Sequence, residues 1–296
     1  MGKASIAIIG TSGFLGQPVI NAIESGIFDD KIAFPVKAVT RTKKTSTDKV
    51  QYVQGALDES GIDALAAELK GIDTIISLVG GNPDLYVSVE KLVKLVKPQL
   101  YIPSQFGTEI DKSAKIFPGL LGFKQEHSKN LRSAGIKVVD IVTGLFAVPG
   151  AFLYELVGAV GVDTENKTVT YRGNADDKFP VSKVDDIGRV VVAVAVSDPA
   201  SLPDKVRTYS DVVTQRQVVE RYEQTHNVKF AVKNISASDS LKEGQDKWNS
   251  AGFKLELFFF YLNVLLSQGT DNGLIFSKDE RDLVNPHESL WKWSKF

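Results

Sequence analysis

The stretch Ala4-Ser-Ile-Ala-Ile-Ile-Gly-Thr-Ser-Gly-Phe-Leu-Gly-Gln-Pro-Val-Ile-Asn-Ala-Ile-Glu-Ser-Gly26 decides how the rest of the chain is interpreted. It begins with an apolar, β-branched run, Ile6–Ile9, that is typical of a buried parallel strand. Gly10, Gly13 and Gly16 follow at three-residue spacing, and apolar residues then recur with a helical period up to a final glycine. A strand, a glycine turn and a helix in this order predict a dinucleotide-binding unit.

The three glycines of this turn are expected to serve different purposes. Gly10 permits the tight turn, Gly13 lets backbone N–H groups approach a pyrophosphate, and Gly16 lets the helix pack close to the strand. The N-terminus of the helix adds partial positive charge. The alternative, an ordinary glycine-rich turn, is disfavoured by the flanking strand and helix. The residues predicted to hold the cofactor here are Gly10, Thr11, Ser12, Gly13, Phe14, Leu15 and Gly16.

Length and composition restrict the class of protein. A chain of 296 residues suits one large α/β domain, or a nucleotide domain with a smaller partner lobe. The formal net charge of −1 gives no general attraction for nucleic acid or anionic lipid. The absence of cysteine excludes disulfides, thiolate metal sites and a cysteine nucleophile. We therefore expect a cytoplasmic protein without a nucleic-acid partner.

No membrane partner is expected either. The N-terminus leads directly into the first predicted strand, so no signal peptide is predicted. The longest apolar run, Leu255–Leu266, contains Glu256 and Asn263 and is too short to span a bilayer. We interpret it as a buried or pocket-lining helix.

The end of the second predicted strand, at residues 34–40, indicates which dinucleotide is bound. NAD-preferring folds carry an acidic residue there that accepts the ribose hydroxyls. This chain has Arg41 instead, followed by Lys43 and Lys44, and such cations suit a 2′-phosphate. The alternative is a solvated basic loop. The sequence predicts NADPH/NADP+ as the cofactor.

Alternating strands and helices continue as far as residue 143. The predicted strands are 50–54, 74–79, 100–102 and 137–143, and the predicted helices are 62–70, 85–97 and 120–134. This alternation predicts a Rossmann-type, doubly wound parallel sheet of the α/β class. Val79 and Gly80 end one of these strands, at the sheet edge that faces a cofactor.

Beyond residue 150 the pattern becomes mixed. Short strands are predicted at 168–171, 205–209 and 229–232, and helices at 184–195, 215–224, 238–250 and 255–266. We therefore predict an NADP(H)-binding domain at residues 1–150 and a smaller, mixed α/β substrate-binding lobe at residues 151–296. Residues 181–196 are expected to return to the first lobe. The substrate would lie at the junction of the two lobes.

Several other chemistries are disfavoured. No tyrosine has a lysine four residues later, so the Tyr-x-x-x-Lys pair of typical short-chain dehydrogenases is absent. Neither a Gly-x-Ser-x-Gly elbow nor a phosphate-binding P-loop is found. His127, His226 and His287 share no metal-ligand spacing and are expected at the surface or in caps, so no metal is predicted. Asp185 and Asp186 are expected to cap a helix.

Four features together resemble one known group of proteins. The glycine motif, Arg41, Pro103-Ser-Gln-Phe-Gly107 and Lys124 occur in the order found in the isoflavone reductase family. That family includes the phenylcoumaran benzylic ether and pinoresinol–lariciresinol reductases, within the wider NmrA-like atypical short-chain dehydrogenases. Val79-Gly-Gly81 and Val184-Asp-Asp-Ile-Gly188 are similar to further family segments, so that the resemblance covers most of the chain.

The resemblance implies roles for individual residues. Lys124 corresponds to the catalytic lysine, a general acid/base beside the nicotinamide, whose pKa partial burial would depress. The segment Ser104, Gln105 and Phe106 would contact the cofactor. Two departures are visible, because Gln105 replaces the family's glutamate and Thr143-Gly-Leu-Phe146 replaces its Asn-Cys-Phe-like step.

The favoured hypothesis is an NADPH-dependent reductase acting on a small aromatic or polyketide-like metabolite. Phe106, Phe146 and Phe152 would wall its substrate pocket, the alternative being that they are plain core residues. Two other functions stay open: an NmrA-like dinucleotide-sensing regulator without turnover, and a redox-neutral isomerase or dehydratase. We expect a monomer or a homodimer.

Overall fold

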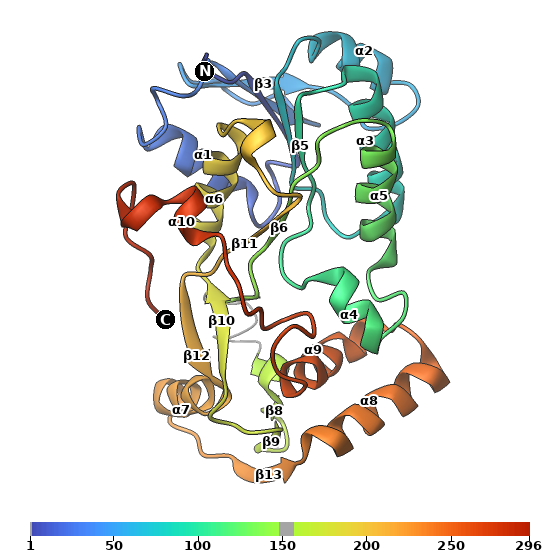
Figure 1. Cartoon of the computed structure of the whole chain (residues 1–296), viewed down its shortest axis with the longest axis vertical. Helices are drawn as coiled ribbons and strands as arrows, with labels where there is room; N and C mark the ends of the chain where they lie inside the picture. Colours follow the sequence, from blue (N-terminus) through green and yellow to red (C-terminus); the bar gives the residue numbers. More distant parts are fainter. Residues whose placement is uncertain (1, 148–156) are drawn as a thin grey trace.

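A parallel sheet of five strands, in the order β3-β2-β1-β4-β5, organises the N-terminal part of the computed structural model (Figure 1). The model describes residues 2–147 and 157–296. β1 lies at the centre, where Ile8 pairs with Ala38 on one side and Ile76 on the other. The strands are β1 (Ile6–Ile9), β2 (Val36–Thr40), β3 (Val50–Gln54), β4 (Thr74–Ser77) and β5 (Leu100–Ile102).

The sheet continues beyond β5 through chain from both halves of the sequence. Tyr101 forms a parallel bridge with Val138. β6 (Asp140–Val142) then pairs in parallel with β11 (Lys205–Arg207). The edge of the parallel layer is therefore completed by a strand that lies far along the chain.

Helices cover both faces of this sheet, as alternating βα units require. Figure 1 shows α1 (Gly16–Glu24) and α6 (Val184–Ala195) on one face. The opposite face carries α2 (Ile62–Glu68), α3 (Pro83–Val96) and α5 (Gly122–Ser133). The predicted doubly wound, Rossmann-type sheet is confirmed.

The contact between α1 and α6 is close. A Cβ atom on Gly188 would overlap the carbonyl oxygen of Pro18, so the two helices meet at the level of their backbones. Around this contact, Val19, Ile23 and Val191 are fully buried. Only a glycine on α6 allows this approach.

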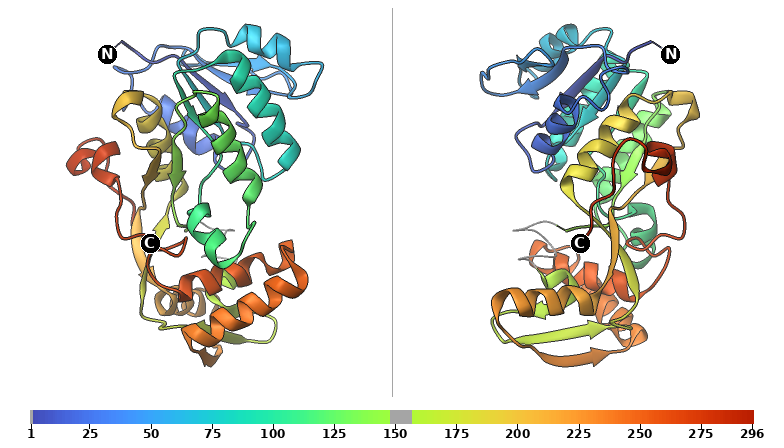
Figure 2. Two further views of the ribbon diagram at one scale, coloured as in Figure 1. Left: turned by 45° about the vertical axis from the view of Figure 1, so that its right-hand side comes forward. Right: turned by 90° about the vertical axis from the view of Figure 1, so that its left-hand side faces the viewer.

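The smaller, mixed part of the molecule lies below the sheet in Figure 1 and is seen from two further sides in Figure 2. It has two three-stranded sheets, β12-β10-β7 and β13-β9-β8. Its strands are β7 (Leu145–Phe146), β8 (Val162–Asp163), β9 (Thr168–Arg172), β10 (Lys178–Ser182), β12 (Asp211–Thr214) and β13 (Ala231–Ile235). Its long helices are α7 (Gln215–His226), α8 (Ala237–Ala251) and α9 (Phe258–Ser267).

Shorter elements join these parts. They are α4 (Ile110–Ile116), α10 (Arg281–Val284) and the 3₁₀ turns η1 (Val157–Val160), η2 (Pro199–Ser201), η3 (Leu255–Leu257) and η4 (Pro286–Glu288). The helix predicted at 255–266 is thus divided into η3 and α9. The predicted lobe boundary at residue 150, and Phe152, lie outside the described residues.

The end of the chain connects both parts. The backbone N–H of Ser294 donates to the buried carboxylate of Asp186 on α6, at 2.8 Å. The N–H of Phe296 donates to Asp211 on β12, at 3.1 Å. This segment runs from α10 past α6 to the mixed sheet (Figure 1).

Two predictions about polar residues were wrong. No side chain caps α6, since Asp186 instead accepts hydrogen bonds from Arg189 and Ser294, although its charge does lie in the first turn. His127 is 2% exposed rather than at the surface. Its ring bonds to the hydroxyl of Tyr101 at 2.8 Å, because both side chains lie between α5 and the sheet.

Candidate active site

A cavity of about 480 Å³ opens at the carboxyl ends of the parallel strands. This is the edge where ligands of doubly wound sheets bind. The cavity brings together the glycine loop, the end of β2 and the end of β4. Seven of the predicted cofactor residues line it, namely Gly10, Thr11, Ser12, Gly13, Arg41, Val79 and Gly80.

The glycine loop leaves room and polar groups for a ligand. Gly10 has a φ of +94°, and a Cβ there would lie 2.8 Å from the backbone of Leu78, so no other residue fits. The hydroxyl of Thr11 is buried and has no hydrogen-bond partner among the described residues. A buried hydroxyl without a partner, in a residue that lines the cavity, needs a hydrogen-bond partner that a bound ligand can supply.

The cavity carries positive charge at the end of β2. Arg41 lines the cavity and forms no ion pair with any described carboxylate. Asp58, the only carboxylate among the described residues that line the cavity, accepts hydrogen bonds from Ser60 and from the N–H of Gly61 at the start of α2, which lower its pKa. Lys43 and Lys44 do not line the cavity, and the amine of Lys44 lies 5.3 Å from the ring centre of Tyr52.

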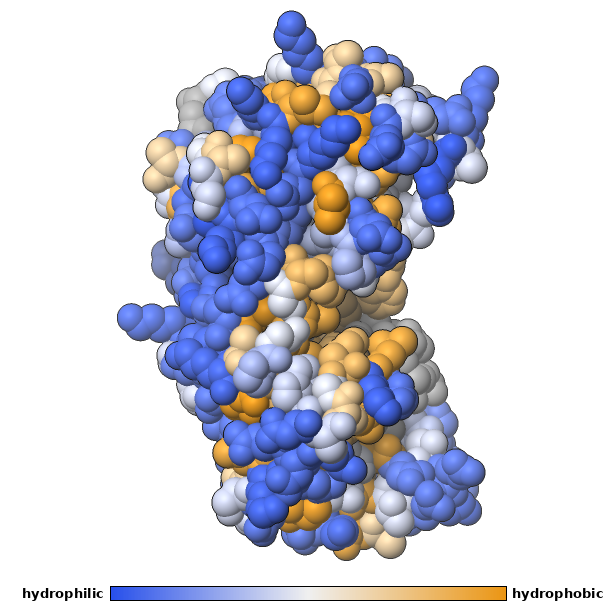
Figure 3. Space-filling view, turned by 90° about the vertical axis from the view of Figure 1, so that its right-hand side faces the viewer, coloured by the Kyte–Doolittle hydropathy of each residue, from blue (hydrophilic) through white to orange (hydrophobic). Residues whose placement is uncertain are grey.

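A second, smaller cavity of about 170 Å³ lies between the sheet and the mixed part. Apolar side chains gather at the hollow between these two parts (Figure 3). Gly81 lines this cavity while Gly80 lines the larger one, so the two spaces are adjacent. Its lining consists of Gly81, Phe106, Gly107, Thr108, Leu121, Lys124, Gly144, Leu145, Phe146, Phe258, Leu262 and Leu274.

Among the described residues that line this apolar cavity, Lys124 is the only ionisable one. Its amine donates to the carbonyl oxygen of Ser104 at 2.9 Å. The hydroxyl of Tyr86 donates to the same oxygen at 2.7 Å, and the amine lies 5.9 Å from the centre of the Tyr86 ring. Removal from water lowers the pKa of Lys124 to about 8, because burial disfavours the charged form.

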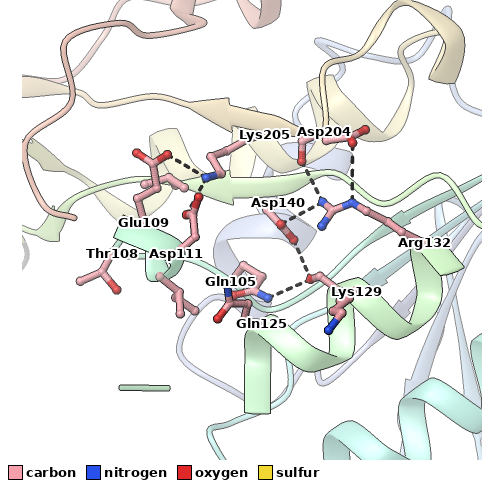
Figure 4. Close-up of a pocket in the computed structure, with 13 residues that line it drawn as sticks. Gln105, Thr108, Glu109, Asp111, Gln125, Lys129, Arg132, Asp140, Asp204 and Lys205 are labelled. Atoms are coloured by element: carbon pink, nitrogen blue, oxygen red, sulfur yellow. Dashed lines mark hydrogen bonds and ion pairs between the residues drawn. The ribbon is translucent and has the colours of Figure 1, made fainter. Parts of the chain in front are cut away.

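Gln105, which follows Ser104 in the chain, forms a hydrogen bond with the backbone of Lys124. Gln105 is 4% exposed, and its amide nitrogen donates to the carbonyl oxygen of Lys124 at 2.5 Å and to Ser128 Oγ at 2.9 Å. Gln105 does not line either of the two cavities described above. It faces a third, polar cavity of about 330 Å³ (Figure 4).

The aromatic residues predicted for the site come from three segments, namely the glycine loop, the loop after β5 and strand β7. Phe106 and Phe146 line the apolar cavity. Phe14 is 55% exposed and stacks on Phe146, with ring centres 5.8 Å apart. Phe14, Leu15 and Gly16 do not line the larger cavity, and neither do Ser104, Gln105 and Phe106.

The sequence pattern does not mark Tyr86 or Thr108 as site residues. Tyr86 lies on a helix whose apolar period marks it only as a core residue, and it is indeed 3% exposed. Thr108 follows the Pro103–Gly107 segment and belongs to no sequence motif. Their positions follow from tertiary packing, which a single sequence does not display.

The described residues contain no cluster of three or more histidine, aspartate or glutamate side chains that could hold a metal ion. Within the same residues, no helix has both the length and the apolar character needed to cross a membrane.

Known proteins share this sequence pattern. Residues 2–253 match the sequence model of the NmrA-like family. An isoflavone reductase homolog from Solanum tuberosum is 26% identical over 236 residues, which cover 75% of this chain and 74% of the relative. Bifunctional pinoresinol-lariciresinol reductase 1 from Thuja plicata is 26% identical over 268 residues, covering 83% and 82%.

Solved structures share the fold. A crystal structure of isoflavone reductase has a TM-score of 0.66 at 19% identity, covering 88% of this chain and 86% of that one. The complex of leucoanthocyanidin reductase with NADPH from Vitis vinifera has a TM-score of 0.63 at 19% identity, covering 89% and 86%. The resemblance inferred from the motifs is confirmed, and the chain belongs to the NmrA-like family.

Proposed function

We propose that the protein is an NADPH-dependent reductase of a small, uncharged, aromatic or polyketide-like metabolite. The observation that carries this proposal is the position of Lys124. Within the part of the chain that the structure describes, a lysine with a pKa of about 8 is the only ionisable side chain lining an apolar cavity that adjoins the larger cavity at Gly80–Gly81. An amine that can exchange a proton near neutral pH is what a reductase needs there.

The larger cavity fits a phosphorylated dinucleotide. Its glycine loop lines the cavity and includes Thr11, whose buried hydroxyl has no partner among the described residues, and Arg41 offers a guanidinium to a 2′-phosphate. The leucoanthocyanidin reductase that shares the fold was solved with NADPH. When bound, the dinucleotide supplies a hydride from its nicotinamide ring.

The residues of the chain itself would then perform three tasks. Phe106, Phe146 and Leu262 exclude water and hold an apolar ring system. The ammonium of Lys124 gives a proton to the substrate oxygen that gains negative charge when an electrophilic carbon is reduced. Ser104 holds this amine in place through its carbonyl oxygen.

The decisive experiment compares Lys124→Ala with Lys129→Ala. Lys129 is an exposed lysine of the same helix. We expect Lys124→Ala to lower turnover by about 10²–10⁴-fold, the usual effect of losing a general acid, while NADPH affinity is retained. Turnover is followed by NADPH oxidation with a panel of aromatic enones and quinone methides. Lys129→Ala serves as the control and should behave like the wild type.

Other outcomes would point elsewhere. Undiminished turnover of Lys124→Ala would remove this lysine from the mechanism. Tighter binding of NAD+ than of NADPH, with no turnover of any compound, would support a dinucleotide-sensing regulator instead. Product formed without consumption of NADPH would support a redox-neutral isomerase or dehydratase.

A further inference from the structure

A chain of hydrogen bonds leads from the third cavity to Lys124. Gln105 donates to the carbonyl oxygen of Lys124 and to Ser128 Oγ. Ser128 in turn donates to the carboxylate of Asp140 at 2.8 Å, and Arg132 donates to the same carboxylate at 2.9 Å (Figure 4). The two cavities on either side of the 103–109 segment share one lining residue, Thr108.

The direction of these bonds requires an amide at position 105. The carbonyl oxygen of Lys124 can only accept a hydrogen bond. The hydrogen of the Ser128 hydroxyl is given to Asp140, so this hydroxyl accepts from Gln105. Both partners therefore need a donor, and the NH₂ group of Gln105 provides two. A carboxylate in the same place would provide none.

Two neighbouring residues of one loop, Ser104 and Gln105, thus bond to the side chain and to the backbone of Lys124, respectively. Ser104 accepts a hydrogen bond from the amine of Lys124, and Gln105 donates to its backbone carbonyl. Gln105 and Ser128 are 4% and 2% exposed. Removing one partner would therefore cost the free energy of a buried hydrogen bond. No side-chain cap fixes the start of α5, where Lys124 lies.

We propose that Gln105 is a positioning residue for Lys124. Its neutral amide joins the first turn of α5 to the loop after β5, and so determines where the amine stands in the apolar cavity. The catalytic consequence of this inference rests on the proposed reductase function. The geometric part, that Gln105 keeps Lys124 in its desolvated position, does not.

The ionisable groups around this connection come from several elements. Tyr86 on α3 faces the amine of Lys124. Asp140 on β6 lies at the far end of the Ser128 link, and burial raises its pKa, although Arg132 opposes this effect. Arg132 also lies 3.8 Å from Asp204. A glutamate at position 105 would stand one hydroxyl group away from the Asp140 carboxylate.

The test uses two variants and one matched control. Gln105→Met keeps the approximate length of the side chain and removes both donors. Gln105→Glu keeps the shape and replaces the donors with a carboxylate. Gln125→Glu places the same charge directly beside Lys124 on α5, but the Gln125 side chain is exposed and forms no hydrogen bond with the Lys124 carbonyl.

The first measurement does not depend on activity. The rate of reductive methylation of Lys124 is followed against pH in the protein without substrate, by mass spectrometry of the peptide that contains it. The wild type should show half-titration near pH 8. In Gln105→Met the lysine should become hydrated, and an increase in pKa by one or two units lowers labelling at pH 8 by about five- to fifty-fold.

The second measurement is turnover. Both Gln105 variants should lower kcat and leave the KM for NADPH close to the wild-type value. The loss in Gln105→Glu should grow as pH rises and its carboxylate ionises. Gln125→Glu should change Lys124 labelling and kcat much less than Gln105→Glu does. If Gln105→Met does not fold, Lys124 labelling and kcat are measured in the near-isosteric Gln105→Glu instead.

The outcomes separate this inference from the proposed function. A wild-type lysine that titrates near pH 8 and shifts in Gln105→Met supports the positioning role, even if no compound is reduced. An active wild type whose Lys124 labelling and kcat are unchanged in Gln105→Met overturns the positioning role alone. Equal shifts in Gln105→Glu and Gln125→Glu would also overturn it, because they would show an effect of charge only.

Discussion

At the scale of single residues, Arg41 determines the expected choice of cofactor. It is the one cation at the end of β2 that lines the larger cavity. Arg41→Ala should weaken NADPH binding by about 1.5–3 kcal/mol, as for a hydrogen bond to a charged group, and should leave NADH binding nearly unchanged. Titration of both dinucleotides by calorimetry measures the difference.

Lys43 gives the matched control for this prediction. It belongs to the same basic loop but does not line the cavity, so Lys43→Ala should weaken NADPH binding by less than Arg41→Ala. If Arg41→Ala weakened NADPH and NADH equally, the guanidinium would not bind a 2′-phosphate.

The depressed pKa of Lys124 predicts the pH dependence of turnover. The ammonium that gives the proton is the major form below about pH 8 and disappears above it. When proton transfer limits the rate, kcat should therefore fall about tenfold per pH unit above this value. A profile of kcat from pH 6 to 10 measures this decline. Lys124→Arg, which stays protonated throughout, should lose the decline together with most activity.

At the scale of elements, the contact of α1 with α6 depends on one glycine. Gly188→Ala places a methyl group on the Pro18 carbonyl and should lower the free energy of unfolding by about 1–3 kcal/mol. Gly122→Ala is the control, because a Cβ there meets nothing within 4 Å. That variant should be unchanged or slightly more stable, since alanine favours helices. Urea unfolding compares the two, and equal stabilities would contradict the proposed overlap.

The elements that sequence analysis predicted are those with strong local patterns. The buried strand β1 and the amphipathic helix α3 are examples, since each shows its period within a few residues. β10 was missed because Pro180 interrupts it and because its partners, β7 and β12, are distant in sequence. The short helix α4 shows no clear period.

The candidate site was predictable to a similar extent. The glycine loop and Arg41 can be recognised from their residue types and their places after predicted strands. Lys124 was singled out only through the family resemblance. The bond from Gln105 to the Lys124 carbonyl could not be predicted, because it depends on how a loop and a helix pack together.

At the scale of the whole molecule, one buried carboxylate joins the sheet, α4 and the chain before α10. Glu109 is 2% exposed and contacts Lys205 at 2.7 Å, Arg207 at 2.9 Å and Lys112 at 3.4 Å. Lys112 also pairs with Asp271 at 2.8 Å. Burial alone would raise the pKa of Glu109, but the hydrogen bonds from Arg207 and Lys205 lower it to about 2.

This shift predicts how stability changes with acid. The pKa of Glu109 is lower in the folded state than its ordinary value of 4.5, so its contribution is present above pH 4.5 and is lost as pH falls toward 2. The loss should be on the order of 3 kcal/mol. Glu109→Gln should show a flatter decline in this range, measured by urea unfolding at successive pH values. Glu126→Gln, on exposed α5 surface, should decline like the wild type, and an equally steep decline in Glu109→Gln would contradict the assignment.

The bond between Asp186 and Ser294 has a consequence for how the protein is made. The two residues are 108 positions apart, so α6 leaves the ribosome long before the amide that completes its buried carboxylate. A buried charge without its partners is costly. The parallel sheet and α6 can therefore assemble early in translation, but their packing reaches its final form only when residues 291–296 have emerged.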